Sequence, residues 1–515
     1  MEIDRHGGES SDAPAPGRRF GLRSRRLHPF FQDVSVTLLA QACVAIGGLL
    51  LARLLAHNAG ADGFASYSLV KQAANILFPV VTVGLVGGLP RYLALPAGRD
   101  DPSAGSYLVA AAAICWGATA IAVVAALAAP DAVAALFFGS SEASEYVLPF
   151  ALLLAATSSF YIAYGYFRGL LRLRMGSLLQ VSALGALPPA VVAIAPGEPV
   201  DRLIVAMAVG TAVLSLAAIA VPLAHGLGSA RRATMRTATH RLWGYGHRRV
   251  PGEMAQLGLF VLVPVLAAHV TTLREVAYLS AGQQILSIVS LAVLPLGLVL
   301  LPSLTRMWEE DRERTAGHVA QLSSFAASLA LFASVQAVLY AGIAVTAWLG
   351  PEFEDAGSVL TVTVAPTALF VVYLMLRSPL DAVAVKSYNS RNNLAALSVF
   401  VAVAALLLGL DLISPALGVA WAFAAGVTTQ GLLTFLTVHR FFGVRWHDYG
   451  FRYTVPIALV VGALGLLARP TIEAVPATLL SLLGLQIVLA ALYFGAIALS
   501  PVRWPKLLAE RLFDR

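Results

Sequence analysis

Three polar side chains, Lys71, Gln72 and Asn75, interrupt an apolar stretch that runs from Phe64 to Leu89. Lys71 and Asn75 are spaced i, i+4, so a helix places them on one face. A charged side chain inside a membrane helix is costly and usually faces a cavity or a partner. We therefore interpret the three residues as a polar stripe that lines an aqueous cavity. The alternative is that the stem of Lys71 extends outward to the lipid headgroups.

Four more polar residues lie near the predicted outer ends of apolar stretches: Arg53, His269, Gln283 and Gln284. We predict that they also line the cavity. Each has an alternative structural role. Arg53 could reach the outer headgroups, His269 could be an ordinary helix-end residue, and the glutamines could hydrogen-bond between helices.

A further charged pair, Arg377 and Asp381, lies near the predicted inner end of a later stretch with i, i+4 spacing. This spacing predicts an ion pair that neutralises itself or serves as a gate. Asp381 is also the one acidic residue close to a span interior that could titrate for proton coupling. Cations otherwise exceed anions in the apolar stretches, which favours an anionic substrate such as a phosphate or diphosphate head group. Proton- or sodium-driven drug exporters need buried carboxylates instead.

The elements that must position these residues are membrane helices. The chain has 515 residues, of which 58% are hydrophobic and only 12% charged, against about 25% charged in a soluble domain. Apolar runs of spanning length recur from Val34 onward. We predict an all-α polytopic membrane protein with fourteen spans, at 34–56, 65–90, 106–129, 146–167, 175–196, 203–225, 252–273, 277–304, 319–348, 358–380, 392–410, 416–439, 453–468 and 477–500.

The distribution of basic residues predicts the orientation. With both termini in the cytoplasm, 29 of the 35 Lys and Arg residues fall in inside segments. Only three fall in outside loops, which is the asymmetry expected of a multi-pass protein of the cell membrane. The first 33 residues are arginine-rich and too long for the n-region of a signal peptide, so we expect a retained tail.

A repeat predicts the domain organisation. The span that opens FASYSLVKQ (64–72) is similar to the one that opens EVAYLSAGQQ (275–284), six spans later. Six spans per half permit a parallel repeat about the membrane normal. We predict a basic cytoplasmic tail at 1–33 and two pseudo-symmetric six-helix bundles at 34–225 and 252–440. A basic cytoplasmic linker at 226–251 joins the bundles, and two further helices and a cytoplasmic tail follow at 441–515.

Several functions are disfavoured. The net charge of +7 reflects basic cytoplasmic loops and not nucleic-acid binding. Cys43 and Cys115 lie in separate apolar runs and offer no metal spacing, and no phosphate-binding loop or zinc motif is present. The outside loops are short, with one acidic patch, PEFEDAG (351–357). We expect no cofactor, no metal and no catalytic residue, and hence no enzyme.

The segment 47–94 resembles the opening of polysaccharide-export flippases. These belong to the multidrug, oligosaccharidyl-lipid and polysaccharide flippase superfamily. The family pattern of LAR-LLG followed by an aromatic-Gly pair is similar to LARLLAHNAGADGFASY here, and its Gly-rich, Arg-terminated helix to VGLVGGLPRYLA. LREVAYLSAGQQ (273–284) resembles the family's second-half motif, with Ala277 in place of a glycine. Many relatives carry an Asp in the seventh span, where this chain reads FVLVPVL (260–266).

This resemblance implies the translocation of polyprenyl-diphosphate-linked oligosaccharide for cell-surface polysaccharide biosynthesis, by alternating access. It implies that Arg53 and Lys71 are cavity cations for the diphosphate and that Arg91 is an inner-end gate or interface residue. The implied partners are the lipid-linked oligosaccharide, membrane lipids, and a glycan polymerase or glycosyltransferases of the same pathway. The main alternative is a cation-coupled drug or small-molecule antiporter of the same fold.

Overall fold

The computed structural model describes residues 29–94, 102–229, 232–247, 249–383, 388–473 and 478–502. Within these ranges all regular structure is helical, which confirms the predicted all-α membrane fold. The tail predicted at 1–33 lies outside the described residues, except that the first helix begins at Pro29. The C-terminal tail after Val502 also lies outside them.

The described part of the chain is a succession of helices. In chain order they are α1 (Pro29–Val81), α2 (Leu85–Ala94), α3 (Ala104–Ala128), α4 (Pro130–Phe138), η1 (Ser141–Tyr146), α5 (Val147–Gly169), α6 (Leu173–Gln180), η2 (Val181–Ala186), α7 (Leu187–Ile194), α8 (Val200–Ser229), α9 (Arg232–Gly246), α10 (Val250–Val270), α11 (Leu273–Glu310), α12 (Arg312–Leu349), η3 (Pro351–Ala356), α13 (Gly357–Val364), α14 (Thr367–Val383), α15 (Tyr388–Leu410), α16 (Pro415–Phe442), η4 (Trp446–Tyr449), α17 (Phe451–Glu473) and α18 (Thr478–Leu499).

The first helix, α1, is two membrane spans joined at Gly60. Its 53 residues would extend about 80 Å at 1.5 Å per residue, far more than the roughly 30 Å of a bilayer core. Gly60 has φ 69° and ψ −173°, which breaks the helix, and this left-handed φ favours glycine. Each half of α1 is therefore one crossing of the bilayer.

The number of spans agrees with the prediction once α1 is counted twice. Among the described residues, eleven helices are long and apolar enough to cross a membrane. A twelfth is the segment from η3 through α14, which is bent by 44°. Dividing α1 gives one more, and α11, with 38 residues, covers the span predicted at 277–304. Together these account for all fourteen predicted spans.

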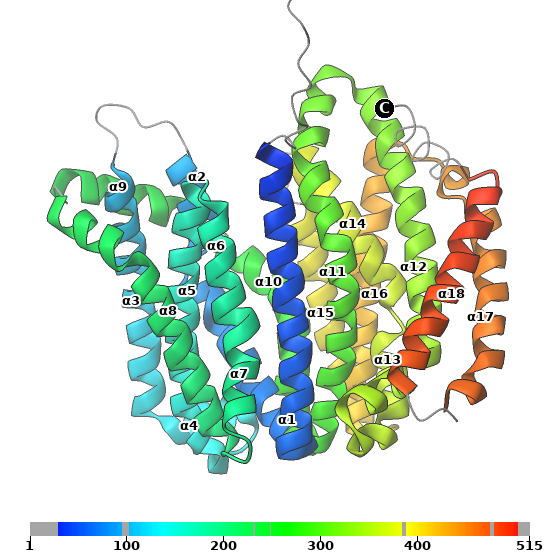
Figure 1. Cartoon of the computed structure of the whole chain (residues 1–515), viewed down its shortest axis with the longest axis horizontal. Coiled ribbons are helices and arrows are strands. Elements are labelled where there is room, and N and C mark those ends of the chain that lie inside the picture. Colours follow the sequence, from blue (N-terminus) through cyan, green and yellow to red (C-terminus); the bar gives the residue numbers. More distant parts are fainter. Residues whose placement is uncertain are drawn as a thin grey trace, which may run out of the picture.

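The helices gather into two bundles. Figure 1 shows α2 to α9 on one side and α11 to α18 on the other, with α1 at the junction. One apolar core lies within the first bundle, around Leu108, Phe160 and Leu242. A larger core contains Ala65 and Ala73 of α1 together with residues of α10 to α16. The same core also contains Phe138, Phe150 and Ile204 of α4, α5 and α8, so the second half of α1 is buried between the two bundles.

The segment predicted as a basic linker, 226–251, is mostly structured. The last turn of α8 and all of α9 fall within it. Ala238 and Leu242 of α9 are fully buried in the core of the first bundle. The segment is therefore a helix docked on the first bundle. We call the end of the molecule that carries α9 the α9 end (Figure 1). The opposite end, where α1 breaks at Gly60, is the Gly60 end.

Candidate functional site

The polar stripe predicted from sequence lies on the second half of α1. Lys71 is exposed, whereas its neighbours Val70 and Ala73 are fully buried. Asn75 Nδ2 donates a hydrogen bond to Gln72 Oε1 at 3.1 Å, and the Lys71 ammonium lies 6.0 Å from the centroid of the Tyr67 ring. The helix therefore presents a cation, two amides and an aromatic ring close together, while Val70 and Ala73 are packed against neighbouring helices.

Lys71 lies deep in its span. It lies eleven positions after the break at Gly60, which is about 16 Å along the helix. The helix that carries it contacts α5 of the first bundle and α10 and α11 of the second. Lys71 is thus an exposed cation on the helix that joins the two bundles.

Arg53 does not accompany Lys71. It lies in the first half of α1 and binds the end of α12: its Nη1 donates to the Trp348 carbonyl at 2.8 Å and to the Ala347 carbonyl at 3.3 Å. The last carbonyls of a helix lack hydrogen-bond partners within the helix and carry partial negative charge. The Arg53 guanidinium provides both hydrogen-bond donors and a positive charge for them. Trp348 Nε1 donates in return to the Leu49 carbonyl at 3.1 Å.

Glu352 makes a second link at the Gly60 end. The backbone N–H of Ala61, directly after the break in α1, donates to Glu352 Oε2 at 2.7 Å. The Tyr278 hydroxyl of α11 donates to the Glu352 carbonyl at 3.1 Å. The buried ring of Phe353 packs between Phe64 and Tyr278, with centroid distances of 6.0 and 5.8 Å. The hairpin of α1 is thereby attached to η3 and α11.

His269 makes a third link between the bundles. Its Nε2 lies 3.0 Å from the Ala135 carbonyl of α4, and its Nδ1 lies 2.8 Å from the Val265 carbonyl of its own helix. Carbonyls only accept, so both contacts are hydrogen bonds only when both ring nitrogens carry protons. Nearby, Gly139 has φ 78°, and a Cβ there would collide with the backbone carbonyl of Ala268. We name the three links, through Arg53, Glu352 and His269, the Gly60-end latch.

The glutamines of α11 have separate environments. Gln283 is buried, and its Nε2 donates to the Phe260 carbonyl of α10 at 2.8 Å. This is the interhelical hydrogen bond that was the alternative to a cavity role. Gln284 is half-buried, and its Nε2 lies about 4.0 Å from where a Cβ of Gly48 would be. It therefore faces the first half of α1.

The charged residues at the α9 end also differ from the prediction. Within the described part of the chain, no ion pair within 4.0 Å joins Arg377 to Asp381. Asp381 Oδ1 instead accepts a hydrogen bond from Asn389 Nδ2 at 2.7 Å, and the Arg377 guanidinium lies 5.6 Å from the Tyr373 ring. The two side chains therefore do not pair with each other, and each has its own partner: Asn389 of α15 for Asp381 and the Tyr373 ring for Arg377.

Arg91 forms part of a helix interface. Its guanidinium lies 5.4 Å from the Tyr245 ring of α9, and that of Arg249 lies 4.5 Å from the same ring. Two glycines make this interface close: a Cβ at Gly84, in the turn before α2, would meet the Gly246 carbonyl, and one at Gly88, within α2, would meet the Tyr245 ring. Arg91 therefore joins α2 to α9 within the first half of the chain.

Sequence reasoning missed Glu352 and Trp348 as functional candidates. Glu352 belongs to the one acidic patch of the predicted outside loops, and that isolation was the available signal. Trp348 gave no signal. Among the described residues, no group of three or more His, Cys, Asp or Glu is placed to hold a metal ion.

Comparisons with known proteins agree on the fold. No protein-family model and no curated protein sequence matches the chain. A structure described as lipid II flippase MurJ in an inward closed conformation is similar over 94% of this chain and 100% of that one, at 10% identity and a TM-score of 0.66. An inward-facing multidrug-resistance MATE transporter of the MOP superfamily is similar over 80% and 98%, at 14% identity and a TM-score of 0.60. The chain therefore has the fold that the flippases and transporters of the MOP superfamily share.

Proposed function

We propose that this protein is a flippase that moves a polyprenyl-diphosphate-linked oligosaccharide across the cell membrane by alternating access. The observation that carries the proposal is the exposed, cationic Lys71 deep in the helix that joins the two bundles. A similar fold that serves a lipid II flippase is compatible with such a substrate.

The sign of the charge supports an anionic head group. Between Phe64 and Leu89 the chain has one cation and no acidic residue. A diphosphate is prohibitively costly to transfer through bare hydrocarbon. In our proposal Lys71 offsets that cost, Gln72 and Asn75 provide hydrogen bonds to phosphate or sugar, and the polyprenyl tail stays in the lipid.

The latch supports an alternating-access cycle. Its three links all join the first part of the chain to the second at the Gly60 end. In our proposal the structure is the state closed at that end, and the substrate leaves only after the links break. Arg53 thus acts as a gate residue and not as a cavity cation.

The orientation follows from the charge asymmetry of the sequence. We assign the α9 end to the cytoplasm, because the basic segments gather there. The Gly60 end then faces the outside. A polymerase or glycosyltransferases of the same pathway would consume or supply the oligosaccharide.

The competing function is a cation-coupled antiporter, because MATE transporters share the fold. The two functions are separable with purified protein in proteoliposomes. We expect translocation of a fluorescent polyprenyl-diphosphate oligosaccharide without an imposed ion gradient. Export of a cationic dye that requires a proton or sodium gradient, with no movement of the oligosaccharide, would instead support the antiporter.

A further inference from the structure

The basic helix α9 has one face held in place and one face open. On the held face, Ala238 and Leu242 are fully buried in the first bundle. Arg241 Nη1 also donates a hydrogen bond to the Tyr107 hydroxyl of α3 at 3.0 Å. The C-terminal end of the helix is fixed by the close approach of Gly246 to Val83. The rotation of α9 about its own axis is therefore set by packing.

The open face carries a regular stripe. Arg236, His240, Trp243 and His247 follow one another at steps of four, three and four residues, which places them along one side of a helix. All four are exposed, and Trp243 is 51% exposed. Its ring stacks with that of His247 at a centroid distance of 6.2 Å and an interplanar angle of 20°. An exposed tryptophan held against a histidine is an unusual feature for a surface that faces only water.

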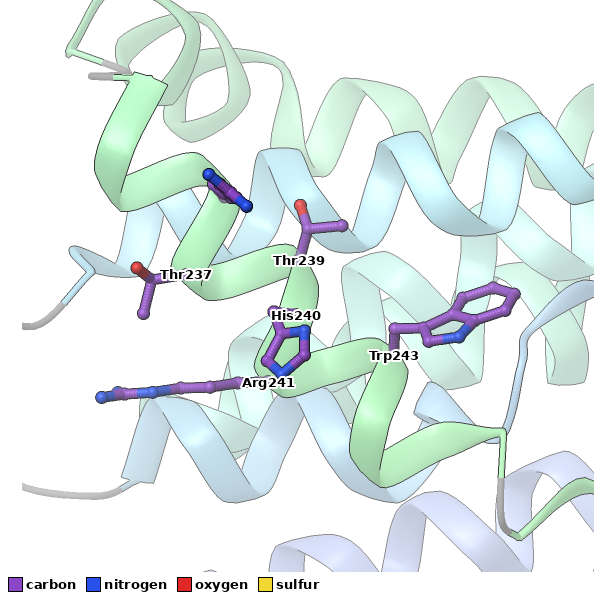
Figure 2. Close-up of a pocket in the computed structure, with 6 residues that line it drawn as sticks. Thr237, Thr239, His240, Arg241 and Trp243 are labelled. Carbon is purple, nitrogen blue, oxygen red and sulfur yellow. The ribbon is translucent and has the colours of Figure 1, made fainter.

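A shallow hollow lies along this helix. Its volume is about 740 Å³, and six residues of α9 line it, including Arg236, His240 and Trp243. Figure 2 shows Thr237 and Arg241 extending to one side of the α9 ribbon and Trp243 to the other, with His240 between them. The lining thus combines cationic groups, hydroxyls and an indole, which suits a charged head group attached to an apolar body.

The charge around the stripe is of one sign. No Asp or Glu occurs between Asp201 and Glu253, whereas this stretch holds seven arginines and three histidines. Helix α9 therefore contains no acidic residue, and Asp201 lies in the first turn of α8, at the end of that helix remote from α9. A surface with so many cations and no internal anion is complementary to an anionic partner.

The stripe adjoins the lipid-facing surface. α8 is a membrane span whose Val221 and Leu227 are 66% and 60% exposed, and α9 follows it after only a few residues. α9 contacts α2 and α3 and lies at the N-terminal end of α3 (Figure 1). Tryptophan and arginine are typical of helices at headgroup level.

We propose that the Arg236–His240–Trp243–His247 stripe binds the anionic phospholipid headgroups of the leaflet at the α9 end. Arg236 and the histidines contact phosphate, and Trp243 inserts at the boundary between headgroups and acyl chains. Such binding would fix the first bundle relative to the membrane while the second bundle moves. The inference does not depend on the transported substrate.

Native mass spectrometry of the purified full-length protein tests the proposal, with phosphatidylglycerol and phosphatidylcholine as the two probes. We expect the wild type to retain more phosphatidylglycerol than phosphatidylcholine. The double variant Arg236→Gln/His240→Gln should retain at least about threefold less phosphatidylglycerol, and Arg236→Glu less again, with phosphatidylcholine unchanged. Raising the salt concentration should weaken phosphatidylglycerol retention, because exposed charges are screened.

Arg314→Gln is the matched control, because Arg314 is also exposed and lies in the first turn of α12 at the same end. It should retain phosphatidylglycerol as the wild type does. Unchanged phosphatidylglycerol retention in the stripe variants, or an equal loss in Arg314→Gln, would overturn the proposal. A wild type that binds a soluble polyglutamate peptide but shows no preference for phosphatidylglycerol would also overturn it, and would assign the stripe to a protein partner. Melting temperatures of all variants exclude unfolding as the cause.

Discussion

Replacing Glu352 with alanine should open the Gly60 end. The substitution removes the carboxylate that accepts from the Ala61 N–H at 2.7 Å. It leaves the Glu352 carbonyl, which holds Tyr278, in place. A hydrogen bond to a charged group contributes about 1.5–3 kcal/mol when well shielded. Because Glu352 is exposed, we take about 0.5–1.5 kcal/mol, which corresponds to a shift of about 2- to 12-fold toward the open state.

Spin-label distance measurements in proteoliposomes check this shift. Labels at Asn58 and Asp355, both exposed and on opposite sides of the latch, report the separation of the α1 hairpin from η3. In Glu352→Ala we expect the longer-distance population to grow by the stated factor. Glu352→Gln keeps an acceptor oxygen without the charge and should show about half of the effect in free energy.

Glu354→Ala is the control, because Glu354 lies in the same segment and is also exposed. If Glu352→Ala and Glu354→Ala give the same distance distribution as the wild type, the carboxylate does not stabilise closure and the reasoning is refuted. If both shift it equally, general loss of negative charge is responsible and not the hydrogen bond to Ala61.

Two further predictions concern packing and buried hydroxyls. Gly47→Ala should lower the melting temperature, because the new Cβ would collide with the Gly185 backbone and overpacking costs about 1–3 kcal/mol. Gly117→Ala should be neutral or stabilising by up to about 1 kcal/mol, because no atom of the described residues lies within 4 Å of the new Cβ. Equal melting temperatures for the two variants would contradict the close approach of Gly47 to Gly185. Tyr493→Phe should lose about 1 kcal/mol, because its hydroxyl donates to the Ser328 carbonyl at 2.9 Å. Tyr449→Phe should be neutral or stabilising, because its buried hydroxyl has no hydrogen-bond partner among the residues that the structure describes. A larger loss at Tyr449 than at Tyr493 in thermal unfolding would contradict this assignment.

The sequence predicts the spans well because their physics is local. Each span needs about twenty apolar residues, whatever its neighbours are, so run length alone locates fourteen of them. The polar stripe is equally local, because the i, i+4 spacing of Lys71 and Asn75 determines their common face. Helix α9 also carried a local signal in Met235, Ala238 and Leu242, spaced three and four residues apart. The many arginines around these three residues instead favoured the prediction of a cytoplasmic linker.

The roles of single polar residues were harder to predict because their partners are distant in sequence. Arg53 binds carbonyls almost 300 residues away, and nothing in LLLARLLA indicates a helix end at Trp348. Gln283 likewise satisfies a carbonyl on another helix. Arg377 and Asp381 have the spacing of an ion pair, but Asn389 provides Asp381 with a closer partner. Spacing restricts which residues could meet, and the tertiary fold selects among them.

The most direct test of the central claim is the rate of flipping of a fluorescent polyprenyl-diphosphate oligosaccharide in proteoliposomes, for the wild type, Lys71→Met and Lys71→Arg. Methionine keeps most of the side-chain volume without the charge, and arginine keeps the charge. We predict that the wild type flips the probe, that Lys71→Met flips it at least about tenfold more slowly, as expected for the loss of roughly 1.4 kcal/mol, and that Lys71→Arg recovers most of the rate. A folded Lys71→Met variant that flips the probe at the wild-type rate would contradict the account.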